Sequence, residues 1–170
     1  MDRGRLIRLV AVASILLSTV GCDQATKQLA RVQLEHRRAN LGFVQLILSE
    51  NPGGFLSLGG RLPDNVRLGI MVVGVCVGLT ALLIYLLRAA HLRGVMFFGL
   101  ALLLAGGVSN LLDRCFRKGL VTDFIYVQIG PLHTGIFNVA DMAIVLGIAL
   151  VLFSAWRHPD PKPALQAMKH

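Results

Sequence analysis

Long apolar runs separated by short polar segments make up most of this chain. The two longest runs without a charged residue are Leu68 to Leu87, with twenty residues, and Gly94 to Leu112, with nineteen. A helix needs about 20 apolar residues to cross a hydrocarbon core roughly 30 Å thick. These runs therefore predict two membrane-spanning helices.

Two further runs become long enough to cross a membrane only if each contains one acidic residue. The run that begins at Leu9 extends to Thr26 if Asp23 is accepted near the interface, and the last run includes Asp141. We therefore expect a mainly α membrane protein with four transmembrane helices. The expected spans are about 9–26, 68–87, 94–112 and 136–156.

The polar segments between the spans predict a small extracytoplasmic β element. Phe43 to Leu48 and Phe55 to Leu58 are apolar, and turn-forming residues from Ser49 to Gly54 separate them. Such a pattern is typical of a hairpin. The strand-like run Leu120 to Ile129 is expected to pack beside it. The alternative is a pair of ordinary connecting loops.

Composition agrees with a membrane protein and narrows the choice of partners. The chain has 170 residues, 55% hydrophobic and 15% charged, with a mean hydropathy of +0.67. An ordinary soluble domain has roughly 25% charged residues. The net charge of +8 is mostly carried beside the spans, where it suits contact with anionic lipid. We expect membrane lipid as a partner and no nucleic acid.

Basic residues occur on both sides of the spans, so their number alone does not fix the orientation. If the N-terminus is cytoplasmic, three groups of basic residues lie on the cytoplasmic side. They are the arginines before span one, the arginines of the short loop after span two and the basic C-terminal residues. On this orientation residues 1–157 form one four-span domain and 158–170 a cytoplasmic tail. Segments 27–67 and 113–135 then face outward.

Two acidic residues within apolar sequence are the first candidates for chemistry. Asp141 lies five residues into the run from Phe137 to Trp156, and Asp123 lies within Leu120 to Val127. A carboxylate inside a membrane segment is costly and usually marks a functional site. Because the two acids come from different elements, they can meet at one membrane face.

Further residues, polar except for one glycine, gather at the ends of the expected spans and in the predicted turn, all toward the outer leaflet in this orientation. They predict a single site. In chain order they are Asp23, Lys27, Asn51, Gly53, Asn110, Asp113, Arg114 and Asn138. Asp23 and Lys27 are four residues apart, so they fall on one helix face and can pair. Arg114 can bind a carboxylate through two hydrogen bonds.

Several alternatives compete with this site. His133 could join Asp123 and Asp141 around a metal, but no recognised ligand spacing supports this, and a loop histidine is the favoured interpretation. Cys22 follows an apolar N-terminal run as in a lipoprotein signal, although Thr19 stands where Leu is usual. A proton-coupled carrier would predict further acids on spans two and three, and the runs 68–87 and 94–112 contain none. A non-enzymatic scaffold would not explain polar clusters on one leaflet.

The ordered motifs resemble one known family. D-Q-x-x-K, N-x-G, G-x-x-x-N-x-x-D-R, V-x-D-F and F-N-x-A-D, read from Asp23 to Asp141, resemble lipoprotein signal peptidase, the type II signal peptidase of bacteria. The resemblance implies an aspartic endopeptidase of the inner membrane that removes signal peptides from prolipoproteins, cutting before a diacylglyceryl-modified cysteine. It implies a catalytic dyad of Asp123 and Asp141, with the other polar residues binding or positioning substrate. It also implies inhibition by compounds of the globomycin type.

The implied chemistry suits two carboxyl groups. Two negative charges at close range cannot both form easily, so the pair shares one proton, and one group acts as base while the other acts as acid. No metal or cofactor is required. Two departures from the family pattern stand out. Gly54 and Phe55 follow Gly53 where small residues such as alanine are more frequent. The spacing from Asp113 to Asp123 looks about one residue longer than usual, which implies a longer turn near Lys118 and Gly119.

Overall fold

The computed structural model describes residues 3–52, 63, 66, 69–89, 91–92 and 94–157. Within this part of the chain, four helices are long and apolar enough to cross a membrane. They are α1 (Arg3–Leu34), the π-helical segment η2 (Gly69–Gly74) continued by α3 (Val75–Arg88), α4 (Gly94–Phe116) and α5 (Val139–Arg157). A small antiparallel sheet accompanies them. The expected fold class, a mainly α membrane protein with a small β element, is confirmed.

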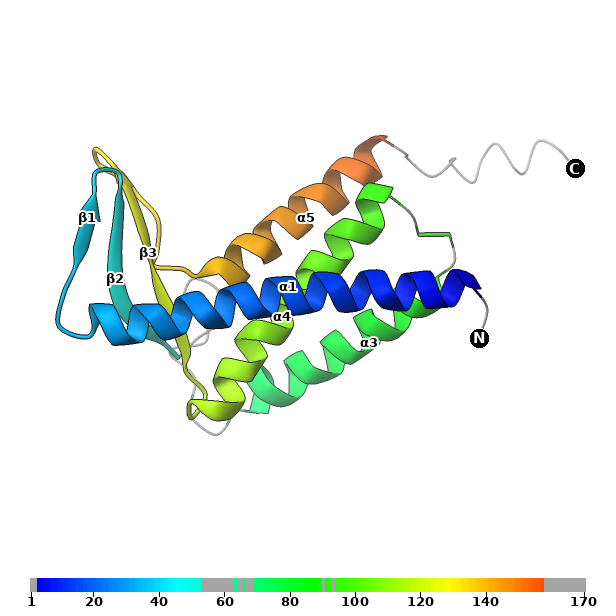
Figure 1. Ribbon diagram of the computed structural model, residues 1–170, viewed down its shortest axis with the longest axis horizontal. Coiled ribbons are helices and arrows are strands. Elements are labelled where there is room, and N and C mark those ends of the chain that lie inside the picture. Colours follow the sequence, from blue (N-terminus) through cyan, green and yellow to red (C-terminus); the bar gives the residue numbers. More distant parts are fainter. Residues whose placement is uncertain are drawn as a thin grey trace, which may run out of the picture.

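Helix α4 lies at the centre of the bundle and packs against α1, α3 and α5 (Figure 1). Glycines let α4 and α5 approach closely. A Cβ on Gly147 would lie 2.6 Å from the carbonyl oxygen of Gly99, and one on Gly106 would meet the carbonyl oxygen of Ala140. Small residues at such contacts allow helix backbones to pack tightly in membranes. The contact at Gly106 fixes the first turn of α5 beside α4.

Helix α1 is longer than the predicted span 9–26. It runs from Arg3 to Leu34, and 32 residues at 1.5 Å per residue give a length of about 48 Å, well beyond a hydrocarbon core of roughly 30 Å. The outward segment was expected to begin at Lys27, yet the helix continues through this residue because its side chain is buried among polar groups. The expected outward segment 27–67 therefore begins as helix.

The sheet has the strand order β1-β2-β3-β4, with antiparallel pairing throughout. The strands are β1 (Ala39–Leu41), β2 (Val44–Asn51), β3 (Val121–Ile129) and β4 (Leu132–His133). The register between β2 and β3 shifts between Leu46 and Ser49, which marks a bulge. Beyond the bulge, Ser49 faces Asp123 and Asn51 faces Val121. The pairing thus brings Asn51 close to Asp123.

The first half of the predicted turn, which was expected from Ser49 to Gly54, is wrong, and Gly53 and Gly54 lie outside the described residues. Ser49, Glu50 and Asn51 form part of β2 instead of a turn, because β3 supplies their backbone pairing. The hairpin turn lies at Gly42 and Phe43, where Gly42 has φ 85°, in the region that favours glycine. The second predicted apolar segment, 55–58, lies outside the described residues. The predicted neighbour, 120–129, does pair with the first segment as strand β3.

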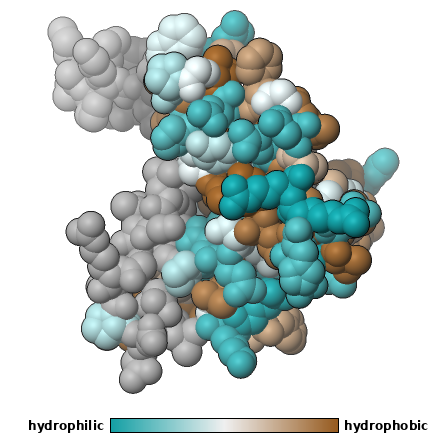
Figure 2. Space-filling model, turned by 90° about the vertical axis from the view of Figure 1, so that its left-hand side faces the viewer, coloured by the Kyte–Doolittle hydropathy of each residue, from teal (hydrophilic) through white to brown (hydrophobic). Residues whose placement is uncertain are grey.

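The two ends of the molecule differ. The sheet lies at one end of the helix bundle, whereas α1 begins and α5 ends at the other (Figure 1). The face at the sheet end carries many hydrophilic residues with apolar ones between them (Figure 2). The site described next lies where the bundle meets the sheet.

Candidate active site

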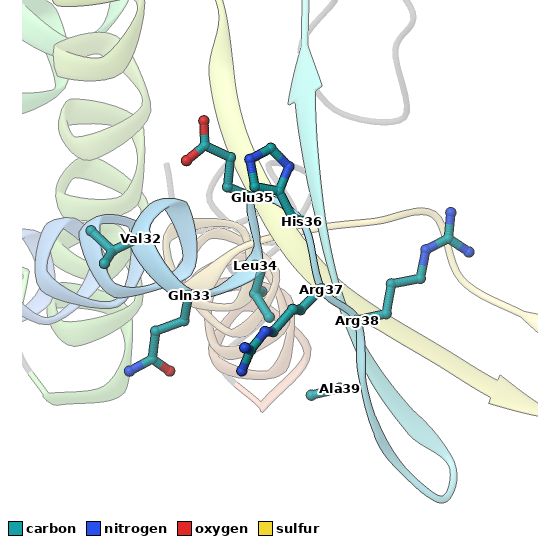
Figure 3. Close-up of a pocket in the computed structure, with 8 residues that line it drawn as sticks. All are labelled: Val32, Gln33, Leu34, Glu35, His36, Arg37, Arg38 and Ala39. Carbon is teal, nitrogen blue, oxygen red and sulfur yellow. The ribbon is translucent and has the colours of Figure 1, made fainter.

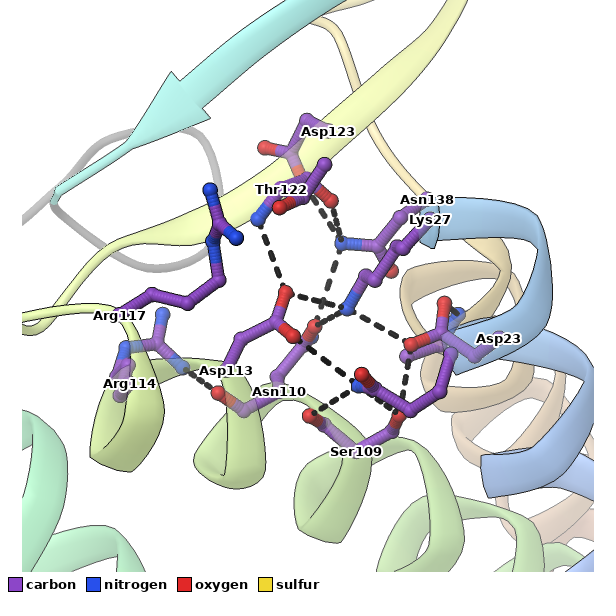
Figure 4. Close-up of polar contacts among 12 residues, drawn as sticks. Asp23, Lys27, Ser109, Asn110, Asp113, Arg114, Arg117, Thr122, Asp123 and Asn138 are labelled. Atoms are coloured by element: carbon purple, nitrogen blue, oxygen red, sulfur yellow. Dashed lines mark hydrogen bonds and ion pairs between the residues drawn. The ribbon is translucent and has the colours of Figure 1, made fainter. Parts of the chain in front are cut away.

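A buried ionic cluster joins α1 to α4 (Figure 4). Lys27 Nζ lies 2.7 Å from Asp23 Oδ2 and 3.1 Å from Asp113 Oδ2. It also donates a hydrogen bond to Asn110 Oδ1 at 2.9 Å. Lys27 and Asp23 are 0% exposed and Asp113 is 2% exposed. Buried charges need such partners to offset the cost of leaving water, so the expected pairing of Asp23 with Lys27 is present.

The same carboxylates bind the segments that carry the other candidate acids. Asp23 accepts a hydrogen bond from Ser109 Oγ at 2.6 Å and one from the backbone N–H of Ala140 at 2.8 Å. Asp113 Oδ2 accepts one from the backbone N–H of Thr122 at 3.0 Å. Ala140 precedes Asp141 and Thr122 precedes Asp123 in the sequence. The ionic cluster therefore fixes the backbone beside both candidate catalytic residues.

The first turn of α5 holds Asp141 in one orientation. The Asp141 N–H donates to Asn138 Oδ1 at 2.9 Å, and the Asn138 N–H donates to Asp141 Oδ2 at 3.2 Å. This reciprocal arrangement is a capping box at a helix N-terminus. The other carboxylate oxygen of Asp141 accepts a hydrogen bond from Asn110 Nδ2 at 2.9 Å. Asp141 is thus held from both α4 and α5.

Asp123 is held on strand β3 by two side-chain amides. Asn138 Nδ2 donates to its Oδ1 at 2.6 Å, and Asn51 Nδ2 donates to its Oδ2 at 2.9 Å. Burial raises the pKa of Asp123 from 3.8 to about 6, the hydrogen bond from Asn51 opposes this rise, and the negative charge of Asp141 adds to it. A carboxyl group with this pKa can hold or release a proton near neutral pH.

Two asparagines connect the candidate acids to one another and to Lys27. Asn110 Oδ1 accepts hydrogen bonds from Lys27 Nζ at 2.9 Å and from Asn138 Nδ2 at 3.2 Å. The amide nitrogens of Asn110 and Asn138 then donate to Asp141 and Asp123 respectively. Because both amide ends are used, neither asparagine can rotate without losing a bond. The candidate acids share one rigid polar framework.

A cleft opens beside this framework. Its volume is about 690 Å³, with Asn51 and Asp141 at its polar end. Its apolar wall along α5 consists of Met142, Val145, Leu146 and Ala149, and the segment from His133 to Phe137 completes the lining. A second pocket, of about 630 Å³, lies at the end of α1 and is lined by residues 32–39 (Figure 3). It shares no residue with the polar framework, so the cleft beside Asp141 is the candidate site.

Three predicted site residues remain, namely Arg114, Asp113 and Gly53. The Arg114 side chain is buried and donates through Nη1 to the carbonyl oxygen of Asn110 at 3.3 Å. Within the described residues Arg114 forms no ion pair; Asp113 pairs with Lys27 instead. Gly53 lies outside the described residues. Helix α4 is longer than the predicted span 94–112 and includes Asp113, so the third membrane helix contains one acidic residue near its end.

Comparison with known proteins identifies the family. The sequence model described as signal peptidase (SPase) II matches residues 15–157. A lipoprotein signal peptidase of Desulforapulum autotrophicum is 38% identical over 157 residues, covering 90% of this chain and 94% of that protein. The chain belongs to the signal peptidase II family. A lipoprotein signal peptidase of Aquifex aeolicus is 31% identical over 153 residues, covering 90% of this chain and 88% of its own.

The fold also matches that of a solved protein. A bacterial membrane enzyme determined by the in meso method at 2.3 Å resolution superposes with a TM-score of 0.75 at 24% identity. The match covers 89% of this chain and 91% of that one. The signal peptidase II family assignment and the four-helix membrane fold therefore agree, and the chain is a membrane peptidase.

Sequence reasoning missed several polar residues of this signal peptidase II site. Gln24 Nε2 donates to Asp113 Oδ1 at 3.1 Å and to Ser109 Oγ at 3.0 Å. Arg31 Nη1 donates to Thr122 Oγ1 at 2.9 Å. Gln24 lies inside the D-Q-x-x-K motif, and Ser109 is a polar residue within an apolar helix next to Asn110. The sequence could therefore have indicated Gln24 and Ser109, whereas the role of Thr122 depends on backbone geometry and is visible only in the structure.

Histidine and cysteine residues contribute no cluster to the site. His133 lines the cleft, and its ring lies 5.8 Å from the Tyr126 ring, centroid to centroid. In the part of the chain that the structure describes, no three His, Cys, Asp or Glu residues gather where they could hold a metal ion. The three cysteines are exposed free thiols. That hydrolysis needs no metal ion stays a prediction, and the cleavage assay with a metal chelator described below would test it.

Proposed function

We propose that this protein removes signal peptides from prolipoproteins and that Asp123 and Asp141 are its catalytic pair. The observation that carries the proposal is the convergence of two carboxylates, the buried Asp123 of β3 and the half-buried Asp141 of α5, on one asparagine framework. Membership of the signal peptidase II family supports the substrate class. The hydrolysis needs two carboxyl groups and one water molecule.

The reaction follows from how a carboxyl pair shares a proton. The ionised carboxylate takes a proton from a water molecule as its oxygen attacks the carbon of the scissile carbonyl. The protonated carboxyl donates to the carbonyl oxygen, which gives a gem-diol intermediate. As the C–N bond breaks, the carboxyl that took the proton from water passes it to the leaving amine, and the other carboxylate takes a proton from a gem-diol hydroxyl. The raised pKa of Asp123, about 6, helps the pair to retain its shared proton. The two groups titrate as a unit.

The cleft along α5 is the proposed substrate site. Its polar end contains Asn51 and Asp141, whereas Met142, Val145 and Leu146 line its apolar wall. An apolar signal peptide and the acyl chains of a diacylglyceryl-modified cysteine both suit such a wall. Cleavage immediately before the modified cysteine then occurs at the polar end. Inhibitors of the globomycin type are expected to occupy this cleft.

The other polar residues act as positioning groups in this proposal. Asn51, Asn110 and Asn138 orient the carboxylates through the hydrogen bonds described above. The buried cluster of Lys27, Asp23 and Asp113 holds the backbone beside the pair, with Arg114 at its edge. We retain Gly53 as a candidate for backbone approach to the substrate on the sequence motif alone. None of these groups carries a proton in the reaction.

We further propose that the protein lies in the bacterial inner membrane with both termini in the cytoplasm. The site and the sheet lie at one end of the bundle, and the start of α1 and the end of α5 lie at the other (Figure 1). This arrangement supports one domain over residues 1–157, with the site toward the outer leaflet. The sequence 158–170 is proposed as a cytoplasmic tail.

A cleavage assay with two matched substrates tests the function. Purified protein in lipid is given a diacylglyceryl-modified prolipoprotein or the same polypeptide without the lipid, and the products are identified by mass spectrometry. We expect cleavage of the modified substrate alone, with the mature product beginning at the modified cysteine and full activity in the presence of a metal chelator. Equal cleavage of both substrates, cleavage at another bond, or loss of activity with chelator contradicts the proposal.

A further inference from the structure

A further pocket, different from the one lined by residues 32–39, lies at the end of the bundle away from the carboxylates. It has a volume of about 610 Å³ and lies between the first turns of α1, the end of α3 and the start of α4. Its principal lining residues are Arg5, Arg8, Arg88, Ile7, Leu87 and Phe97. We call it the arginine pocket. It shares no residue with the cleft beside Asp141.

Arg8 forms the fixed wall of the arginine pocket. Its guanidinium group donates to the carbonyl oxygens of Ala89 at 2.6 Å and Leu92 at 2.8 Å, and it lies 5.8 Å from the centre of the Phe97 ring. These carbonyls follow the end of α3, where a helix carries partial negative charge. Arg8 therefore ties α1 to the loop between α3 and α4 and keeps a positive charge at the pocket.

Arg5 and Arg88 add two exposed positive charges at the same pocket. No hydrogen bond or ion pair involves either side chain in the described part of the chain. The sequence has no Asp or Glu in residues 3–22, 65–112 and 142–157. The helices that build this end of the bundle thus offer the arginines no acidic partner. An anion from outside these helices would balance their charge.

The apolar side of the pocket indicates which kind of anion fits. Ile7, Leu87 and Phe97 line the pocket together with the arginines, and the helices that carry them are apolar enough to span a membrane. A ligand with one charged group and a long apolar chain satisfies both surfaces. Guanidinium groups bind phosphate oxygens through paired hydrogen bonds, and basic pockets between transmembrane helices suit anionic lipid headgroups.

We propose that the arginine pocket binds the phosphodiester headgroup of an anionic phospholipid, with an acyl chain against Ile7, Leu87 and Phe97. The bound lipid bridges Arg5 of α1 and Arg88 of α3, and so joins two helices that Arg8 already connects. Because the lipid binds only the folded protein, it raises the stability of the bundle as its concentration increases. This inference does not depend on the peptidase reaction.

Lipid binding to the full chain tests the proposal. The protein is purified in detergent and titrated with phosphatidylglycerol, phosphatidylcholine or inorganic phosphate, while the thermal unfolding temperature and bound lipid by native mass spectrometry are recorded. We expect phosphatidylglycerol to bind and raise the unfolding temperature, with little effect of the other two. Equal effects of phosphatidylcholine overturn the headgroup assignment. Equal stabilisation by inorganic phosphate overturns the proposal that the ligand is a lipid, and shows a site for small anions instead.

Variants separate this pocket from general surface charge. The double variant Arg5→Gln/Arg88→Gln is expected to weaken phosphatidylglycerol binding about tenfold or more, because it removes the charge-assisted hydrogen bonds of both arginines to the phosphodiester oxygens. Arg3→Gln/Arg157→Gln is the control, because it removes the same charge from exposed arginines that do not line the pocket. Retained binding in the first variant, or an equal loss in both, overturns the proposal.

Discussion

Asn138 and Asp141 bind each other at the start of α5 through two hydrogen bonds, Asp141 N–H to Asn138 Oδ1 at 2.9 Å and Asn138 N–H to Asp141 Oδ2 at 3.2 Å. Because the Asn138 oxygen is used by this cap, its amide nitrogen points toward Asp123, at 2.6 Å. A single asparagine therefore binds both carboxyl groups, each of which a second asparagine also holds.

Replacing Asn138 by Asp should separate its two roles. Asn138→Asp keeps an oxygen for the cap but loses the donor to Asp123 and adds negative charge between the two carboxyl groups. We expect kcat/KM to fall tenfold or more, since a hydrogen bond to a charged group contributes about 1.5–3 kcal/mol. Asn138→Ser, which also keeps a capping oxygen but adds no charge, should lose less.

The matched control for this change is Asn40→Asp on strand β1. Asn40 is exposed and uses its Oδ1 as an acceptor for the Gly42 N–H at 3.0 Å, which Asp can replace. Its cleavage rate should equal that of the wild type. Wild-type kinetics in Asn138→Asp would show that the amide donor has no part in positioning Asp123.

Lys27 should be essential for stability. Lys27→Met leaves Asp23 and Asp113 buried without their shared cation, and removal of one partner from a buried ion pair costs about 3–5 kcal/mol. We expect a large fall in the thermal unfolding temperature in detergent. Lys118→Met, the same change at an exposed position, should leave it unchanged. Equal unfolding temperatures for the two variants would mean that the buried cluster is not stabilised by Lys27.

The raised pKa of Asp123 predicts how stability depends on pH. Since the folded-state pKa of about 6 lies above the ordinary value of 3.8, the folded protein binds a proton that the unfolded chain releases. The stability from this group is complete below the ordinary pKa and is lost as pH rises through the folded pKa, at most about 3 kcal/mol.

Thermal unfolding of wild type and Asp123→Asn between about pH 5 and about pH 8 measures this effect. The variant has no carboxyl group at this position, so the wild type should become less stable relative to it as pH increases. A constant difference between the two proteins over this range would show that Asp123 titrates at the same pH in the folded and unfolded states.

The close contact of α4 and α5 predicts a size limit at Gly147. A Cβ there would lie 2.6 Å from the Gly99 carbonyl oxygen and 2.9 Å from the Leu103 nitrogen, both backbone atoms. Gly147→Ala should therefore destabilise the protein by about 1–3 kcal/mol, as overpacking does. Gly78→Ala on α3 meets no atom within 4 Å and should be neutral or slightly stabilising. Unfolding temperatures of the two variants compare these effects directly, and equal values contradict the tight contact.

The sequence predicts the helices well because an apolar run of sufficient length has few alternatives in a membrane. It also predicts the pairing of Asp23 with Lys27, which depends only on helix periodicity. It does not predict that α1 continues to Leu34. Charged residues such as Lys27 usually end a span. Burial of this one is favourable because Asp113 and Asn110, from a distant segment, bind it in addition to Asp23.

The strands, like the end of α1, depend on contacts with distant segments that the sequence does not reveal. Ser49 and Asn51 are turn formers by local preference, yet they belong to β2 because β3 lies beside them. Tertiary pairing overrides local propensity in such cases. The contacts of Arg8 with the end of α3 join residues about eighty positions apart. No pattern within one helix could reveal them.

The central claim is that Asp123 and Asp141 together carry out hydrolysis. The most direct test compares single-turnover cleavage of a diacylglyceryl-modified prolipoprotein by wild type, Asp123→Asn, Asp141→Asn and Glu50→Gln, each with its unfolding temperature. Glu50 is the control, because it is an exposed acid on β2 whose ion pair with Arg117 lies outside the asparagine framework. We predict no detectable cleavage by either aspartate variant, a wild-type rate for Glu50→Gln and folded protein in every case. Near-normal cleavage by a folded Asp123→Asn or Asp141→Asn variant would contradict the claim.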